Sequence, residues 1–387
     1  ILLGCKAGAA LNAGDHNILL GRYAGCSITS GINNLAIGNN SGLGLVDGTY
    51  NLLFGKDAGK CLSSGSFNTF IGGNGPGHGS ATGISGSHNY AGGYHAMCCI
   101  CSGGCNVAIG QFAGKRITTG TLNVFIGDNI AKCRDMTGNR NVVLGRMSGN
   151  DLTSADDNVA IGAYAGEKLR DGEDNVFIGK RAGKSNESGC ANIMIGEDTG
   201  CQASSSTSHN IFMGHQVAKY VSTSCRNIWL GCRAGGVQVS YTNDNIFLGA
   251  FSGCMITNGD HNIFLGNYAG RSTTNGCNNI VFGYNACTSS ATACSEFVVG
   301  ISTGKWIHGD QSFNVGVGTH APTNRARLHV EGSVHATRFF QNPTTLDTSE
   351  TFPADGGTAV NGGVFGPYTV ASGATLTISS GSTFTII

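Results

Sequence analysis

The chain has 387 residues, of which only 12% are charged and 63 are glycine, and its formal net charge is zero. Such sparse and balanced charge offers no electrostatic attraction to nucleic acid or to acidic lipid surfaces. No apolar run approaches the roughly 20 residues that a membrane helix needs, and glycine does not recur at every third position, which excludes collagen. We therefore expect neither nucleic-acid binding nor membrane insertion.

Residues 1–318 repeat a five-residue string, Asn followed by three apolar residues and a glycine, which we call the anchor glycine. Thirteen of the eighteen intervals between anchors are 17 residues, four are 18 and one is 21. This period predicts an all-β fold, a parallel β-solenoid or β-roll of about 19 rungs. At the usual strand spacing the shaft would be on the order of 90 Å long. The anchors are Gly4, Gly21, Gly38, Gly55, Gly72, Gly93, Gly110, Gly127, Gly145, Gly162, Gly179, Gly196, Gly214, Gly231, Gly249, Gly266, Gly283, Gly300 and Gly318.

The first four residues, Ile1-Leu2-Leu3-Gly4, are the repeat string without its Asn. We therefore expect that the chain begins inside a repeat and belongs to a longer protein, from which a signal peptide or an attachment domain could be missing.

Each string predicts a short strand that is apolar on both faces. Val124 and Ile126, three and one residues before an anchor, share one face, and Phe125 between them lies on the other. Such a strand is buried on both sides. We expect the middle residue to point outward and to pack against sister chains in an intertwined or side-by-side homotrimer; the alternative is a three-layer single chain. The predicted inter-chain residues are Phe70, Phe125, Phe177, Phe212, Trp229, Phe247 and Phe264.

The rest of each repeat predicts tight corners and a weak second strand. Glycines recur four residues after and seven residues before the anchor, where a backbone with positive φ or a close approach is needed. The Asn of each string should stack into a hydrogen-bonded ladder. A ligand-binding row is the less favoured alternative, because the Asn follows the period of the fold. The predicted ladder includes Asn17, Asn34, Asn51, Asn68, Asn106, Asn123, Asn158, Asn175, Asn192 and Asn262.

Most of the sixteen cysteines recur at corner positions, such as Cys190, Cys225, Cys277 and Cys294, six residues before an anchor. They predict small buried residues or disulfides between neighbouring rungs or chains. One Cys-x2-Cys pair, Cys98 and Cys101, has no matching second pair, so zinc is disfavoured. The histidines that precede a repeat Asn should be exposed at corners, or else meet at a trimer axis and bind an ion; they are His16, His88, His209 and His261. We expect no metal, no cofactor and no catalytic residue.

The remaining segments predict a loop, a connector and a tip. The long step between Gly72 and Gly93 indicates a loop bulging from the shaft, or a small break in the stack. Residues 319–340 form a polar connector with one strand at 327–334. Residues 341–387 contain alternating strands at 366–378 and 381–387, which we expect to form a small β tip that seals the open edge of the solenoid.

Strings such as Asn158-Val159-Ala160-Ile161-Gly162 resemble the head repeats of trimeric autotransporter adhesins, whose repeat is usually shorter. That resemblance implies trimeric left-handed parallel β-rolls that bind host surfaces. The longer repeat, the strand at 326–332 and the ending at 366–387 look more like tail-fibre and virion-fibre proteins of marine bacteriophages, including cyanophages. Neither family supplies catalytic residues to carry over.

These observations predict a structural fibre and not an enzyme. We expect a homotrimeric shaft on the surface of a phage or virus-like particle, presenting a distal tip that attaches to a host-cell glycan or protein. The alternative is a secreted bacterial adhesin or extracellular filament subunit. A polysaccharide-degrading tailspike is disfavoured, because it needs clustered carboxylates and here they are scattered over corners.

Overall fold

A computed structural model describes residues 1–75, 83–203, 207–236, 239–318 and 328–330, together with the backbone of six short strands between residues 345 and 386. The chain divides into two units, Ile1–Glu331 and Gly332–Ile387. The described residues contain no helix, so none of them forms a helix that could cross a membrane.

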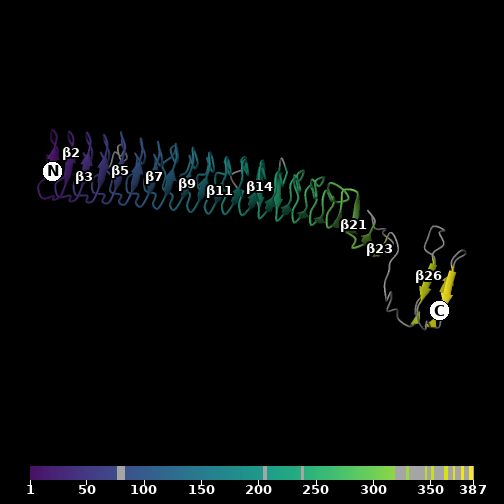
Figure 1. Ribbon diagram of the computed structural model, residues 1–387. Helices are drawn as coiled ribbons and strands as arrows, with labels where there is room; N and C mark the ends of the chain where they lie inside the picture. Colours follow the sequence, from purple (N-terminus) through teal and green to yellow (C-terminus); the bar gives the residue numbers. More distant parts are fainter. Residues whose placement is uncertain are drawn as a thin grey trace. The chain divides into compact units, whose positions relative to one another are not determined.

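The first unit is a parallel β-solenoid of about 18 rungs with a 17-residue period (Figure 1). One strand of each rung pairs in register with the equivalent strand of the next, as Val176, Phe177 and Ile178 pair with Ile193, Met194 and Ile195. The stacked strands are β1 (Leu2–Leu3), β2 (Ile18–Leu20), β3 (Leu35–Ile37), β4 (Leu52–Phe54), β5 (Thr69–Ile71), β6 (Tyr90–Gly92), β7 (Val107–Ile109), β8 (Val124–Ile126), β9 (Val142–Leu144), β10 (Val159–Ile161), β11 (Val176–Ile178), β12 (Ile193–Ile195), β13 (Ile211–Met213), β15 (Ile228–Leu230), β17 (Ile246–Leu248), β18 (Ile263–Leu265), β19 (Ile280–Phe282) and β20 (Phe297–Ile301).

The opposite side of the coil has little regular strand pairing. A second parallel pair forms between β14 (Val221–Cys225) and β16 (Val239–Asn243). Elsewhere on that side there are isolated parallel bridges, such as Leu62 to Ile84 and Ile117 to Met136. The prediction of one strong strand and one weak strand in each rung is therefore confirmed.

The middle residue of each strand points into the coil, which corrects the predicted inter-chain packing. All seven predicted residues have 0% exposure within a single chain: Phe70, Phe125, Phe177, Phe212, Trp229, Phe247 and Phe264. Several stack along the interior, with ring centroids 4.8 Å apart for Phe212 and Trp229 and 4.9 Å apart for Phe247 and Phe264. These aromatic side chains form the core of one chain and are not available to another.

The small residues across the rung explain why the aromatic side chains point inward. Ala182 is buried, and a Cβ built on Gly183 would lie 2.6 Å from the ring of Phe177. The Ala-Gly pair that follows the anchor thus leaves the space that the ring of the same rung fills. The two flanking residues of the strand, Val176 and Ile178, consequently face outward and are only half-buried.

The anchor position requires glycine for two reasons. Gly179 has a φ of +128°, which side-chain-bearing residues rarely adopt, and its Cβ would lie 2.6 Å from the carbonyl oxygen of Gly196 on the next rung. Adjacent rungs approach closely at this corner. Glycine at the anchor position is therefore a steric requirement of the stack.

The coil ends one rung earlier than the sequence repeat. Strand β20 continues through Gly300, which lacks the positive φ of the earlier anchors. It then pairs antiparallel with β21 (Gly304–Gly309), and β21 pairs antiparallel with β22 (Val315–Val317). Strand β23 (Leu328–Val330) lies parallel to β22, within the segment where a strand was predicted. The string that ends at Gly318 is thus part of an antiparallel meander.

In the second unit the strands form three parallel pairs. They join β24 (Thr345–Leu346) to β27 (Thr369–Val370), β25 (Glu350–Phe352) to β28 (Leu376–Ile378), and β26 (Asn361–Val364) to β29 (Thr383–Ile386). Three successive strands thus pair in the same order with the next three. Three predicted segments lie partly outside the described part of the chain: the other residues of the predicted tip, most of the predicted connector, and residues 76–82 of the predicted loop.

Candidate functional site

The predicted asparagine ladder is present and buried inside the coil. The backbone N–H and Nδ2 of Asn192 both donate to Oδ1 of Asn175, at 3.1 and 3.0 Å. Nδ2 of Asn175 in turn donates to the carbonyl of Gly189, three residues before Asn192 on the next rung. The same pattern joins the predicted members, among them Asn17 to Asn34, Asn51 to Asn68, and Asn106 to Asn123. Every polar atom of the ladder side chains is used within the chain, so the ladder is structural.

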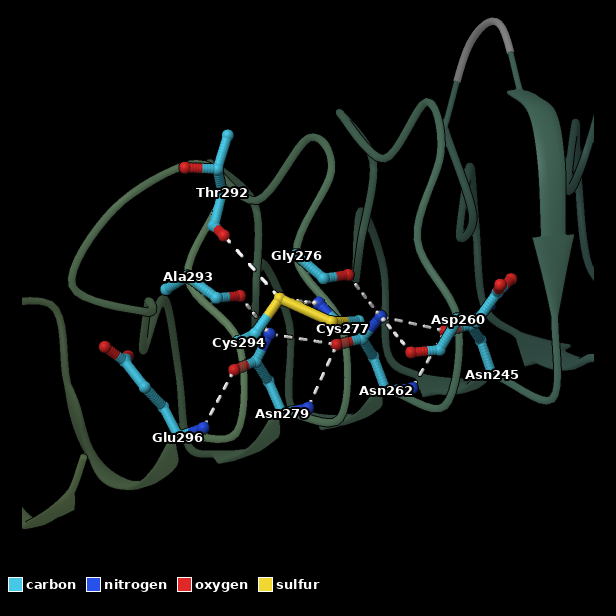
Figure 2. Close-up of a disulfide and its surroundings, with 10 residues drawn as sticks. All are labelled: Asn245, Asp260, Asn262, Gly276, Cys277, Asn279, Thr292, Ala293, Cys294 and Glu296. Carbon is cyan, nitrogen blue, oxygen red and sulfur yellow. Dashed lines mark hydrogen bonds between the residues drawn. A yellow bond between two sulfur atoms is a disulfide. The ribbon is translucent and has the colours of Figure 1, made fainter. Parts of the chain in front are cut away.

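The ladder ends beside a disulfide near the last rungs of the coil. Figure 2 shows Asn245, Asn262, Asn279 and Glu296 in one column. Next to them Cys277 and Cys294, equivalent residues on consecutive rungs, are joined by a disulfide across a sequence separation of 17. One of the cysteine arrangements left open by the sequence, a bond between neighbouring rungs, is therefore found at this place.

The remaining corner residues do not gather into a metal site. Within the described residues no three His, Cys, Asp or Glu side chains come together in a way that could hold a metal ion. The four histidines that precede a ladder Asn are exposed, each with a φ near +60°: His16, His88, His209 and His261. The prediction that they lie exposed at corners is confirmed.

Two adjacent thiols form a chemically distinct pair. The Sγ atoms of Cys98 and Cys99 are 3.4 Å apart, and Cys98 is buried whereas Cys99 is half-buried. The Cys98 thiol hydrogen-bonds Cys99 and, with Lys115 and Arg116 nearby, lowers the pKa of Cys99 to about 6, although burial opposes this shift. The hydrogen bond and burial raise the pKa of Cys98. The hydrogen bond therefore favours ionisation of Cys99 over Cys98.

A buried polar cluster lies where the coil meets β21. Glu296 occupies the position of a ladder Asn, and its carboxylate lies 3.5 Å from Nε2 of His308. The N–H of Ser289 donates to that carboxylate, and Lys305 Nζ lies 3.4 Å from the same imidazole nitrogen. Burial alone would raise the pKa of Glu296, but hydrogen bonds from His308 and Ser289 outweigh it and hold the pKa below its usual value. The cluster ties β20 to β21.

The most extensive feature outside the core is an apolar strip on the outer face of the sheet, which we call the outer stripe. It consists of the residues three and one places before each anchor, from Ile18 and Leu20 to Phe297 and Val299. Neither column contains a charged residue, and Phe54 and Ile126 are 51% and 39% exposed. Soluble monomers rarely expose a continuous apolar surface of this kind. The sequence pattern predicted an outward apolar face but assigned it to the middle residue of each strand, whereas the two flanking residues form it.

The size of the outer stripe matches that of a protein interface. Strands of three residues stacked about 18 times cover on the order of 850 Å². A stable protein–protein interface buries about 800 Å² on each partner. The stripe of one chain is therefore large enough to hold a second copy along its whole length.

Charge is distributed unequally on the two sides of the outer stripe. The residues five and six places before each anchor, here named the acidic border, contain seven Asp or Glu but only two Arg through Gly300. The acids are Asp15, Asp156, Asp157, Glu173, Asp174, Asp244 and Asp260. Arg140 and Arg226, the two cations, pair with Asp157 and Asp244 on the next rung. The border therefore keeps a net negative charge.

The residues one to six places after each anchor, here named the basic turn, have the opposite charge. They contain fifteen Lys or Arg against six Asp or Glu through the same rungs. The bases are Lys6, Arg22, Lys56, Lys60, Lys115, Arg116, Lys132, Arg146, Lys168, Lys180, Arg181, Lys184, Lys219, Arg233 and Arg271. Because the strands are parallel, the acidic border follows their N-terminal ends and the basic turn their C-terminal ends.

A groove runs along the basic turn beside β10 to β13. It has a volume of about 490 Å³ and is lined by Lys168, Arg181, Lys184, Asp198, Cys201 and Lys219, among others. Arg181 hydrogen-bonds Asp198 and holds the pKa of that carboxyl below its usual range. The groove therefore retains an excess of positive charge.

No family model matches this chain, and neither a curated protein nor a solved structure is significantly similar to it.

Proposed function

We propose that this protein is a structural fibre subunit whose outer stripe packs against other copies of the same chain. The observation that carries the proposal is the outer stripe, which has no charged residue in either column over about 18 rungs and is apolar except at Thr69 and Gly92. Hydrophobic burial is the main driving force of stable association. A regular interior ladder and an apolar outer face suit a stiff element that gains stability by bundling.

In the proposed assembly three chains surround a common axis with their outer stripes turned inward. The stripe is only two residues wide, and the polar columns beside it provide the polar rim that protein interfaces have. This homotrimeric arrangement extends the resemblance to phage tail fibres. The proposed location is the surface of a virion, with attachment to a host-cell glycan or protein through the C-terminal unit. Many weak contacts in one fibre would add up to firm attachment.

The test is the solution mass of the purified chain, measured by sedimentation with and without reductant. We expect a trimer that persists after reduction, because the stripe and not a disulfide holds it. Ile126→Ser together with Ile161→Ser places two hydroxyls on the stripe and should shift the protein toward monomer. The matched control, Thr29→Ser, changes an exposed residue away from the stripe. A wild-type chain that stays monomeric at high concentration would refute the proposal.

A secreted adhesin or extracellular filament subunit is the second candidate, supported by the likeness of single strings to adhesin heads. Both candidates use the same self-association, so the mass does not separate them. The sequence of the full-length gene product distinguishes the two candidates. A signal peptide and a membrane anchor would support the adhesin, and a virion-attachment domain would support the fibre. The proposal assigns no catalytic role to the chain.

A further inference from the structure

We propose that copies of this chain associate in parallel and in register, with the acidic border of one copy against the basic turn of the next. This inference rests on the proposed self-association through the outer stripe and adds its direction. The chain has no net charge, yet the N-terminal side of its sheet is acidic and the C-terminal side is basic. Such a polarised surface is self-complementary in some orientations and self-repelling in others.

Symmetry decides which orientation the charges favour. If two outer stripes pack face to face around an axis along the rod, the rods are parallel and their strands run in opposite directions. The acidic border of each copy then meets the basic turn of the other. A three-fold axis along the rod gives the same match between neighbours. If the two-fold axis instead runs along the strands, the rods are antiparallel, and acid meets acid while base meets base.

The local distribution of charge also favours an unshifted register. Glu173 and Asp174 precede β11, are exposed, and form no ion pair or side-chain hydrogen bond within the described part of the chain. The groove lies beside the same rungs on the other side of the sheet, and its Lys168 is likewise exposed without such a partner. In a parallel assembly without axial shift, the free carboxylates of one copy face the groove of its neighbour.

The experiment reverses the charges of each side in the full-length chain and measures association by sedimentation at low salt. One variant carries Glu173→Lys and Asp174→Lys, a second carries Lys168→Glu and Lys219→Glu, and a third carries all four changes. We expect each single-sided variant to associate about tenfold more weakly. The third should recover wild-type affinity, because the two sides are again complementary. High salt should reduce all these differences.

Fluorescence transfer between N-terminal labels gives the direction independently of affinity. Parallel copies bring the labels together, whereas antiparallel rods on the order of 90 Å long place them beyond efficient transfer. Efficient transfer together with recovery in the third variant supports the inference. Association without transfer, or single-sided variants that associate as well as wild type, overturns it and leaves the proposed function standing. A monomer under all conditions refutes the proposed function itself.

Discussion

The buried carboxylate of Glu296 lies 3.5 Å from Nε2 of His308 and so connects the last rung of the coil to the first antiparallel strand. Both side chains are almost fully buried, and Lys305 lies against the same imidazole. Glu296 also continues the ladder, because its backbone N–H donates to Oδ1 of Asn279. The end of the solenoid is thus held by groups that titrate, whereas the ladder before it is neutral.

Acidification should therefore loosen the end of the coil first. The pKa of Glu296 is lower in the folded protein than its usual value, so the unfolded state binds the proton more readily. Its contribution to stability is present above about pH 4.5 and is lost as the pH falls through the folded pKa. Emission of Trp306 on β21, recorded in a Trp229→Phe background, should change in this range before the coil unfolds. In Glu296→Gln the same titration should be absent; an unchanged profile would contradict this assignment.

Removing one ladder amide should destabilise the coil strongly. Asn175→Ala leaves the backbone N–H and Nδ2 of Asn192 without their shared acceptor, and both are fully buried. Each unsatisfied buried group costs about 1–3 kcal/mol. We expect a lower calorimetric midpoint and faster amide exchange in β10 to β12. Asn12→Ala removes an exposed amide and serves as the control; equal effects of the two changes would argue against the ladder.

Neighbouring residues of one strand should have separable roles. Phe177→Ala empties space within the core and should lower the free energy of unfolding by about 3–5 kcal/mol. Ile178→Ser changes the outer stripe and should weaken association more than it weakens the fold. Thermal unfolding and sedimentation of both variants provide the comparison. If Ile178→Ser destabilised the isolated chain as much as Phe177→Ala, the assignment of inner and outer faces would be wrong.

Cys99 should be alkylated faster than the other half-buried thiols. Its pKa is lowered to about 6, and the thiolate is the reacting species. The rate of iodoacetamide labelling, followed by peptide mass spectrometry, should rise to half its plateau near pH 6. Cys254, whose pKa is raised by burial, is the internal control. Cys98→Ala removes the hydrogen-bonding group beside Cys99 and should shift the midpoint of Cys99 upward.

Reduction should weaken the coil near its end. The bond between Cys277 and Cys294 closes a loop of 17 residues, for which loop-closure entropy corresponds to about 3 kcal/mol. We expect reductant, or Cys277→Ser with Cys294→Ser, to lower the unfolding temperature. The double variant should no longer respond to reductant. A wild-type chain insensitive to reductant would show that this bond contributes nothing to stability.

The repeat string alone was enough to predict the period and an all-β fold. It also predicted that Asn175 stacks on Asn192, because rungs of equal length place equivalent residues on top of one another. The same rule could have singled out Cys277 and Cys294, which are 17 residues apart at one corner. Only the tertiary structure decided that Phe177 points inward and Ile178 outward. Alternation along a strand separates its side chains into two faces but does not show which face lies inside the coil. The inner face is decided by Gly183, on the other side of the rung, because its missing side chain leaves room for the ring of Phe177. The end of the parallel coil at Gly300 also required the structure, because there the backbone leaves the conformation of the other anchors although the sequence pattern continues.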